Sequence, residues 1–261
     1  MTPDALAARL ADLCSRAGEV VMAVYATDFE VRAKGDTSPV TEADERAEAV
    51  LLAGLAELLP GVTVVAEEAV AAGGLPEVPG EFLLVDPLDG TREFTSRNGD
   101  FTVNVALVRD GAPVAGAVYA PARSRAFFGG TTAQQASCEP GAALGEATPI
   151  RTRDYPADGL VAVASKSHLD ADTAAFLDRL PLADRRSAGS SLKLCLVAAG
   201  EADVYPRFGP TMEWDIAAGH AVLAAAGGQV LTPDGRPFRY GKVESGLRNG
   251  PFVAWGRTPL L

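Results

Sequence analysis

Two apolar stretches of this 261-residue chain end in acidic residues, and this pattern constrains the fold more than any other feature. Residues 82–85 (FLLV) lead directly into 86–91 (DPLDGT), and residues 62–66 (VTVVA) lead into Glu67-Glu68. Short apolar runs of this kind predict strands buried in a sheet. Acidic side chains crowded at the ends of such strands repel one another, which disfavours their charged form unless cations lie between them. The pattern therefore predicts a metal site beside the strand ends.

The DPLDGT segment places two carboxylates, Asp86 and Asp89, three residues apart. Pro87 stiffens the turn between them, and Gly90 lets the backbone approach closely. Both side chains and the Leu88 carbonyl can therefore point at one place, and hard oxygen ligands of this kind suit Mg²⁺. The alternative is a tight loop in which the aspartates cap the next helix and turn.

Two further aspartates have both a structural and a functional interpretation. Asp215 stands at the start of an expected helix, where it would serve as an N-cap or as another carboxylate of the metal site. Asp44 completes the pattern Thr41-Glu42-Ala43-Asp44, which is typical of a capping box at the start of a helix. For Asp44, the capping and catalytic interpretations are compatible with each other.

The first part of the chain predicts a helix pair on a mainly antiparallel sheet. Apolar residues recur at helical spacing over 6–24 and 47–58, and Pro60-Gly61 stops the second helix. An Asp110-Gly111 pair predicts a hairpin between two strands. The expected strands lie at 62–66, 82–85, 101–108 and 114–119.

From about residue 134 to 148 the composition turns small and polar, which marks the best candidate boundary. Beyond it strands and helices alternate, as in an α/β domain. Expected strands lie at 160–164 and 202–205, and expected helices lie at 171–180, 192–199 and 216–226. The predicted organisation is an α+β first half, residues 1–148, carrying most of the metal ligands, and an α/β second half, residues 149–261.

Charge and cysteine content exclude several classes of protein. A formal net charge of −11 argues against a nucleic-acid polymer as partner, because duplex binding depends on Lys and Arg neutralising phosphates. Cys14, Cys138 and Cys195 are odd in number and far apart, so neither a disulfide framework nor a zinc site is indicated, and a reducing cytoplasm fits. Charges such as Asp4 and Arg9 within the first apolar pattern argue against a signal peptide and a membrane span. Peripheral membrane association and a homodimer stay open.

Taken together, these motifs resemble those of the inositol monophosphatase superfamily of lithium-sensitive, magnesium-dependent phosphatases. The resemblance rests on Glu67-Glu68, on residues 86–91 and on residues 214–219 (WDIAAG). Within the superfamily it is greatest to the 3′(2′),5′-bisphosphate nucleotidases, and it spans almost the whole chain in order. The segments that match this branch are 98–104 (NGDFTVN), 165–168 (SKSH), 189–193 (GSSLK) and 205–210 (YPRFGP).

The resemblance implies a layered αβαβα sugar-phosphatase fold, of mixed α+β and α/β character, with the metals at the junction of the halves. Catalysis would be direct in-line attack by a water molecule that Thr91 and Glu67 orient, and Asp44 would lie near a further metal site. Glu213 adds an acid near the site, and the sequence leaves its role open. The implied ligands of two or three Mg²⁺ ions are Glu67, Asp86, the Leu88 carbonyl, Asp89 and Asp215.

The second half is expected to select the substrate. Ser190 and Ser191 open the helix expected at 192–199, so free N–H groups, hydroxyls and nearby Lys193 predict a small anion site that suits a second phosphate. By the resemblance, His168 lies beside the adenine or ribose. Arg207 stands where inositol phosphatases carry a glutamate that reads a sugar hydroxyl, and an arginine there favours phosphate. The implied reaction, in sulfur assimilation and nucleotide recycling, is hydrolysis of adenosine 3′,5′-bisphosphate to AMP and phosphate. The residues expected to contact the substrate are Leu88, Asp89, Gly90, Thr91, His168, Ser190, Lys193, Arg207 and Asp215.

Other interpretations accompany this hypothesis. An inositol or sugar monophosphatase would share every metal ligand and differ in the second anion site. A nucleotide-binding regulator without turnover would not need the water-activating pair, Glu67 and Thr91. The residues alone also permit purely structural interpretations. Ser190 would then cap a helix on which Lys193 is solvated. Arg207 would form a surface ion pair, and His168 would be a surface residue.

Overall fold

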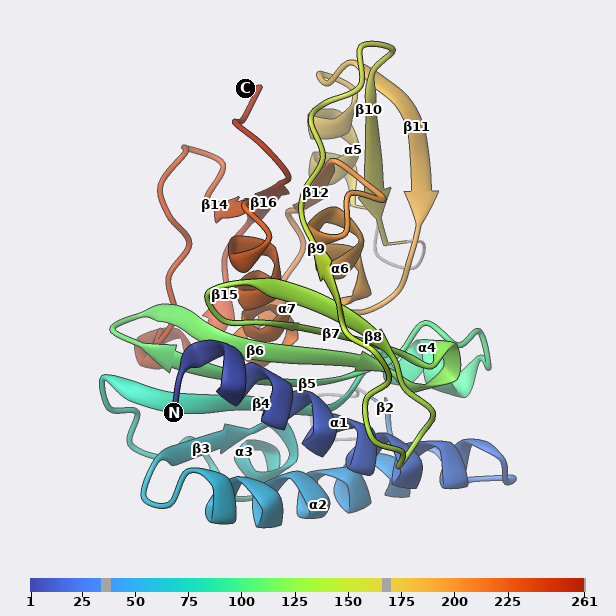
Figure 1. Cartoon of the computed structure of the whole chain (residues 1–261), viewed down its shortest axis with the longest axis vertical. Helices are drawn as coiled ribbons and strands as arrows, with labels where there is room; N and C mark the ends of the chain where they lie inside the picture. Colours follow the sequence, from blue (N-terminus) through green and yellow to red (C-terminus); the bar gives the residue numbers. More distant parts are fainter. Residues whose placement is uncertain (34–38, 166–169, 261) are drawn as a thin grey trace.

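The computed structural model describes residues 1–33, 39–165 and 170–260, which are arranged in five layers (Figure 1). Two helices cover one face of a seven-stranded sheet, and two more helices lie between that sheet and a five-stranded one. A fifth helix packs on the outer face of the second sheet. The layers follow the order αβαβα, which confirms the expected fold class.

The first layer consists of α1, Pro3–Tyr25, and α2, Glu42–Leu58. Each helix begins at a threonine cap. The Thr2 hydroxyl accepts from the Ala5 N–H at 3.2 Å, and Thr41 forms a reciprocal capping box with Asp44. Both helices bury their apolar faces against the larger sheet in one continuous core. The two predicted helices and the capping box are confirmed.

The larger sheet is antiparallel except at one edge, where β3 runs parallel to β4. Its strand order follows the chain. The hairpin between β5 and β6 turns at Asp110 and Gly111, whose φ angles of 51° and 74° match a tight turn of the expected kind. The strands are β3 Thr63–Ala66, β4 Glu81–Asp89, β5 Thr102–Arg109, β6 Ala112–Ala120, β7 Arg125–Gly129, β8 Ala133–Ser137 and β9 Thr148–Ile150.

The middle layer is formed by α6, Leu192–Ala198, and α7, Glu213–Ala225. The helix α7 is buried on nearly all sides, because it packs on the larger sheet with one face and against α6 and β14 with another. In the second sheet β10 is parallel to both neighbours, and β16 is antiparallel to both of its own. Its order is β11 Leu182–Ser187, β10 Leu160–Ala164, β12 Val204–Arg207, β16 Phe252–Trp255 and β14 Gln229–Leu231, with α5 Ala171–Leu177 on its outer face.

Two short helices start where strands of the larger sheet end. The helix α3, Glu67–Gly73, follows β3 without a gap, and α4, Thr91–Thr95, follows β4 after a single residue. The remaining elements are β1 Arg32–Ala33 paired with β2 Pro39–Val40, β13 Thr211–Met212 paired with β15 Arg248–Asn249, and the 3₁₀ turns η1 Pro121–Arg123 and η2 Val243–Ser245.

Several strand predictions differ from the structure. The strand β4 continues through Asp89, so the first four residues of the DPLDGT segment extend the strand instead of following it. The small, polar stretch 134–148 contains most of β8, and position 148/149 falls within β9, which pairs with β8. The strand β11 was not predicted because it is a polar edge strand with exposed side chains. The strands β14 and β16, three and four residues long, were not predicted.

The helix expected at 216–226 starts three residues earlier, at Glu213. Asp215 is therefore the third residue of α7, and its interpretation as the N-cap is wrong. Its Oδ2 atom instead accepts the Met212 N–H at 2.8 Å, which satisfies one of the unpaired donors at the helix start. Within the described ranges, no helix is both long and apolar enough to span a membrane.

Candidate active site

A cleft of about 300 Å³ brings together residues from both halves of the chain. One wall is formed by the ends of β3 and β4 with the helices that follow them, and the other by the starts of α6 and α7 and the end of β12. Apart from Asp44, which lies behind Thr91, every predicted site residue among those the structure describes lines this cleft. His168 lies outside the described residues.

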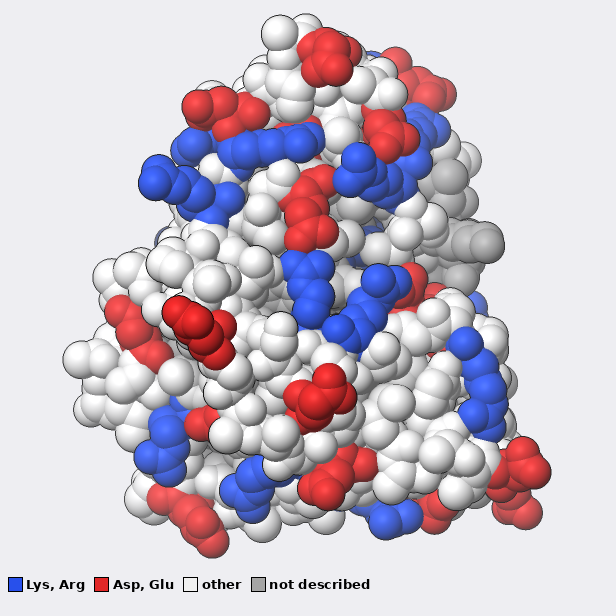
Figure 2. Space-filling view, turned by 45° about the vertical axis from the view of Figure 1, so that its right-hand side comes forward, with Lys and Arg blue, Asp and Glu red and all other residues white. Residues whose placement is uncertain are grey.

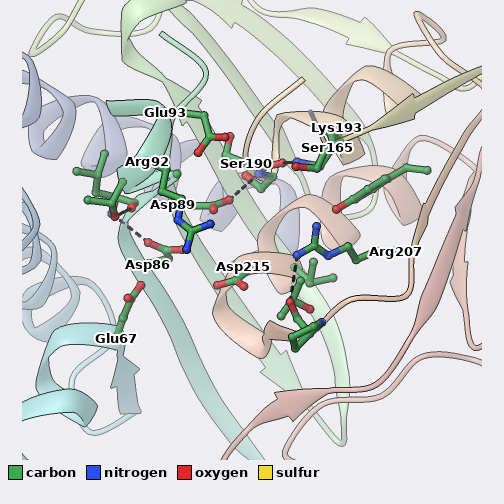
Figure 3. A pocket seen from close by; sticks show the side chains of 18 residues that line it. Glu67, Asp86, Asp89, Arg92, Glu93, Ser165, Ser190, Lys193, Arg207 and Asp215 are labelled. Carbon is green, nitrogen blue, oxygen red and sulfur yellow. Dashed lines mark hydrogen bonds between the residues drawn. The ribbon is translucent and has the colours of Figure 1, made fainter. Parts of the chain in front are cut away.

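Four carboxylates, which we call the acidic cluster, lie on one side of the cleft: Glu67, Asp86, Asp89 and Asp215. Figure 3 shows their side chains directed toward a common space. Glu67 begins α3, Asp86 and Asp89 belong to the final residues of β4, and Asp215 lies in the first turn of α7. The fold thus brings acids from three separate segments to one place.

Burial and mutual repulsion perturb the acidic cluster. Asp86 is 1% exposed, and burial raises the pKa of its carboxyl well above the usual value, with added repulsion from the rest of the cluster. Burial likewise raises the pKa of Asp215, and the charges of Asp89 and Glu67 raise it further. The pKa of Asp89 rises only to about 6 under burial, because the Lys193 charge and the Ser191 N–H favour the carboxylate.

The chemistry of the donors fits divalent cations. Among the described residues, no three His, Cys, Asp or Glu side chains converge closely enough to enclose one ion as they are placed. The acidic cluster nevertheless interacts electrostatically across the cleft, since neighbouring carboxylates raise the pKa of Asp86 and of Asp215. Carboxylate oxygens, together with the Leu88 carbonyl on the cleft wall, are the hard ligands that Mg²⁺ prefers. Cations bound here would remove the repulsion within the cluster.

Asp44 combines its structural role with a place beside the site. Its Oδ2 atom accepts the N–H and the hydroxyl of Thr41, each at 2.8 Å, as the capping box requires. Its Oδ1 atom lies 3.4 Å from the Thr91 hydroxyl, which is also 3.4 Å from the Leu88 carbonyl. Asp44, at 2% exposure, therefore links the start of α2 to the residue expected to orient water.

The turn between β4 and α4 depends on Gly90. This residue adopts a left-handed conformation with φ 94°, which disfavours any side chain. A Cβ atom here would also lie 3.2 Å from the Asp100 carbonyl oxygen. Because the Phe94 N–H donates to the Gly90 carbonyl at 2.9 Å, α4 starts at once, and the backbone of Gly90 and Thr91 borders the cleft.

Opposite the acidic cluster, Ser190, Lys193 and Arg207 form what we call the cationic wall (Figure 3). Lys193 is 4% exposed, and burial lowers its pKa to about 8 despite the favourable charge of Asp89. Its Nζ atom donates to the Ser190 carbonyl and lies 5.2 Å from the centre of the Tyr205 ring. The interpretation of Lys193 as a solvated lysine is therefore wrong.

The side chain of Arg207 is held by backbone carbonyls. Its Nε atom donates to the Gly209 carbonyl and one terminal nitrogen to the Pro210 carbonyl, both at 3.2 Å. Figure 3 shows its guanidinium group directed into the cleft. Two positive side chains from different elements, α6 and β12, thus face the same space as the acidic cluster.

Three buried polar residues, Thr102, Asn104 and Ser191, are linked to Asp89, a role that the matching segments 98–104 and 189–193 did not indicate. The start of the helix was expected to offer free N–H groups to an anion, but the Ser191 N–H donates to Asp89 Oδ2 at 2.6 Å. The Ser191 hydroxyl donates to Asn104 Oδ1 at 2.7 Å and lies 2.9 Å from the Thr102 hydroxyl. These contacts span about ninety residues of sequence or more, so local spacing could not reveal them.

Glu213, whose role the sequence left open, is a structural residue. Its side chain is fully buried and accepts the Gly241 N–H at 2.8 Å and the Lys242 N–H at 2.9 Å. The Lys242 Nζ atom pairs with the same carboxylate at 2.7 Å. Glu213 therefore anchors the segment around residue 241 to the start of α7, and it does not line the cleft.

Figure 2 shows basic and acidic side chains interspersed over one face of the molecule. Among the described residues, partly exposed arginines belong to ion pairs, such as Arg185 with Asp178 at 2.8 Å and Arg125 with Glu201 at 2.7 Å. On the face shown in Figure 2 the two signs of charge are thus mixed, and the formal net charge of the chain is −11.

The fold and this site define a class of protein. The sequence profile of the inositol monophosphatase family matches residues 3–254, so the chain belongs to that family. Among curated relatives it is similar to the 3′(2′),5′-bisphosphate nucleotidase CysQ of Escherichia coli K12. The two are 42% identical over 246 residues, which cover 93% of this chain and 96% of the relative.

Solved structures support the same relationship. The structure of CysQ from Bacteroides thetaiotaomicron, described as a bacterial member of the inositol monophosphatase family, superposes with a TM-score of 0.80 at 36% identity, covering 97% of both chains. An inositol monophosphatase from Anabaena superposes with a TM-score of 0.73 at 25% identity, covering 97% of this chain and 91% of that one.

Proposed function

We propose that this protein is a Mg²⁺-dependent 3′(2′),5′-bisphosphate nucleotidase that hydrolyses the 3′-phosphate of adenosine 3′,5′-bisphosphate to give AMP and phosphate. The observation that carries the proposal is the pairing, in one cleft, of the acidic cluster with the cationic wall. A substrate with two separated phosphates needs both features, one for the phosphate that is cleaved and one for the phosphate that is kept. The similarity to proteins named CysQ supports the same substrate.

Two or three Mg²⁺ ions would be held by Glu67, Asp86, the Leu88 carbonyl, Asp89 and Asp215. When bound, such ions lower the pKa of coordinated water, polarise the phosphoryl group and neutralise the leaving oxygen. Glu67 and Thr91 would orient the attacking water in line with the leaving group. The N–H groups of Gly90 and Thr91 would hold the phosphoryl oxygens. Asp44, next to the Thr91 hydroxyl, would fix the direction of that hydroxyl.

The phosphate that is kept would bind the cationic wall. Lys193 and Arg207 supply positive charge, and the Ser190 hydroxyl supplies a further donor at the start of α6. Because Lys193 is buried, water solvates its ammonium group poorly. The negative charge of a second phosphate would stabilise this positive charge, and the interaction is stronger there than in water. A small nucleotide is therefore the proposed partner. The buried free thiols of Cys14, Cys138 and Cys195 support a cytoplasmic location.

The first test is phosphate release by the purified protein with Mg²⁺. Adenosine 3′,5′-bisphosphate should be hydrolysed faster than inositol 1-phosphate, and the Asp89→Asn variant should lose activity on both. Preference for inositol 1-phosphate would keep the metal mechanism and contradict the proposed substrate. Binding of the nucleotide without release of phosphate from either compound would contradict the enzymatic function itself.

A further inference from the structure

A buried chain of hydrogen bonds runs from β5 to Asp89 by way of Ser191. Thr102, Asn104 and Ser191 are 0%, 1% and 2% exposed, so none of these polar groups is compensated by bulk water. The Ser191 residue is held to β5 through its hydroxyl, which contacts Asn104 Oδ1 at 2.7 Å and the Thr102 hydroxyl at 2.9 Å. Its backbone N–H then reaches Asp89 Oδ2 at 2.6 Å.

The donors in this chain point in one direction. Ser191 has a single hydroxyl proton, which it gives to Asn104 Oδ1, an atom that can only accept. The Thr102 hydroxyl must therefore donate to Ser191. The Asn104 amide nitrogen, fixed by the same bond, lies 3.4 Å from Asp89 Oδ2 and donates to it. Every proton is thus directed toward the Asp89 carboxylate, which favours its charged form.

Both protein donors fall on the same oxygen of Asp89. The Ser191 N–H and the Asn104 amide meet Oδ2, which leaves Oδ1 available to face a cation in the cleft. Donors on one oxygen of a ligating carboxylate fix its rotation and so raise metal affinity. The series of side-chain hydrogen bonds that begins at Thr102 therefore controls the direction in which Asp89 presents its Oδ1 atom.

These hydrogen bonds, with one further bond at Gly189, also hold the start of α6 against the first half of the molecule. Gly189, two residues before Ser191, donates its N–H to Asp100 Oδ2 at 3.2 Å. A Cβ atom at Gly189 would lie 2.4 Å from the Asp100 carbonyl oxygen, so no side chain can stand there without a shift. Residues 189–191 are therefore held against the loop before β5. This segment contains Ser190 and lies two residues before Lys193, so its position fixes both residues of the cationic wall.

We propose that Asn104, Ser191 and Thr102 are positioning residues that orient Asp89 toward Mg²⁺ and fix the cationic wall relative to the acidic cluster. This inference rests on the proposed function. The competing explanation is that the three side chains satisfy one another's hydrogen bonds and contribute to stability alone. The two explanations differ in their prediction for Mg²⁺ affinity. If the residues orient Asp89, a substitution should weaken Mg²⁺ binding more when the residue lies nearer to Asp89 in the series of hydrogen bonds.

Isothermal titration calorimetry of Mg²⁺ binding, with no substrate present, separates them. Asn104→Ala removes a donor to Asp89 and should weaken Mg²⁺ binding about 10-fold or more. Ser191→Ala, which keeps the backbone N–H, should weaken it less, and Thr102→Val least. The double variant Asn104→Ala/Ser191→Ala should bind Mg²⁺ no more weakly than Asn104→Ala, because both substitutions act through one carboxylate.

Thr152→Val serves as the matched control. Thr152 is 1% exposed, and its hydroxyl donates to the Ala226 carbonyl at 3.3 Å, outside the cleft. This variant should lose thermal stability as Thr102→Val does, with unchanged Mg²⁺ affinity. If Ser191→Ala and Thr102→Val lower the melting temperature and leave Mg²⁺ affinity unchanged, the inference is wrong. A parent protein that binds no Mg²⁺ would reject the proposed function as well, whereas unaffected variants of an active parent would reject this inference alone.

Discussion

The two walls of the cleft compensate buried charge in different ways. In the acidic cluster, burial and neighbouring carboxylates raise the pKa of both Asp86 and Asp215, so cations bound between these side chains would relieve the repulsion. On the cationic wall, Lys193 and Arg207 are held by carbonyl oxygens of neighbouring residues, so their positions are set by the protein itself. The comparison suggests a division of labour, in which the acidic cluster determines whether hydrolysis occurs and the cationic wall determines what is hydrolysed.

The largest effect is expected in the acidic cluster. Asp86→Asn removes one proposed ligand and should lower kcat/KM more than about 100-fold for every phosphate ester, since even residues that only support a ligand cost 10- to 100-fold. Without Mg²⁺ the same variant should melt at a higher temperature than the parent, because a repelled carboxylate is gone. The raised pKa of Asp86 means that this gain grows as pH rises from about 4, below which the carboxyl is protonated in both states. Differential scanning calorimetry with and without Mg²⁺ checks both points, and a variant that is less stable at pH 7 would contradict the repulsion.

A smaller, selective effect is expected on the cationic wall. Arg207→Ala should reduce kcat/KM for adenosine 3′,5′-bisphosphate about 10- to 100-fold, the usual worth of a hydrogen bond to a charged group. Hydrolysis of inositol 1-phosphate should be unchanged, because this substrate has no second phosphate for Arg207 to bind. Arg185→Ala, at an exposed ion pair outside the cleft, is the control and should leave both rates alone. If Arg207→Ala lowers kcat/KM equally for both substrates, the proposed division of roles between the two walls is wrong.

The smallest effect is a pH dependence of the cationic wall. Burial lowers the pKa of Lys193 to about 8, so the free enzyme loses this charge as pH rises through that value. The ratio of kcat/KM for the bisphosphate to that for inositol 1-phosphate should then fall by up to about 10-fold between pH 7 and pH 9, since kcat/KM reports the free enzyme. In Lys193→Arg the ratio should stay flat, because arginine keeps its charge in this range. A parallel decline in that variant would assign the titration to another group.

The sequence predicts those parts of the site that depend on local pattern. Glu67 and Asp86 follow directly from apolar runs that form β3 and β4, and the hydrophobic spacing locates α1 and α2. The capping box at Thr41 and Asp44 also has a four-residue signature, and the structure contains it. Each of these features is specified within a few residues, so it can be read without knowledge of the tertiary fold.

Other parts depend on long-range contacts and have no such signature. The N–H of Ser191 meets Asp89 across a sequence separation of 102 residues. The helix α7 starts at Glu213 because that carboxylate is tied to the backbone of residues 241 and 242, which no spacing around position 213 indicates. Likewise, β14 is a strand because it pairs with β16, and β16 in turn pairs with β12, which is distant in sequence.

The position of α7 between the two sheets has a consequence for how the molecule comes apart. Its residues are buried on nearly every side, shared between the larger sheet, α6 and β14. Neither sheet can move away without exposing a helix that has no polar face to offer water. The protein should therefore melt in a single cooperative transition, and a cut at 148/149 should give two fragments that aggregate separately and regain structure only when mixed.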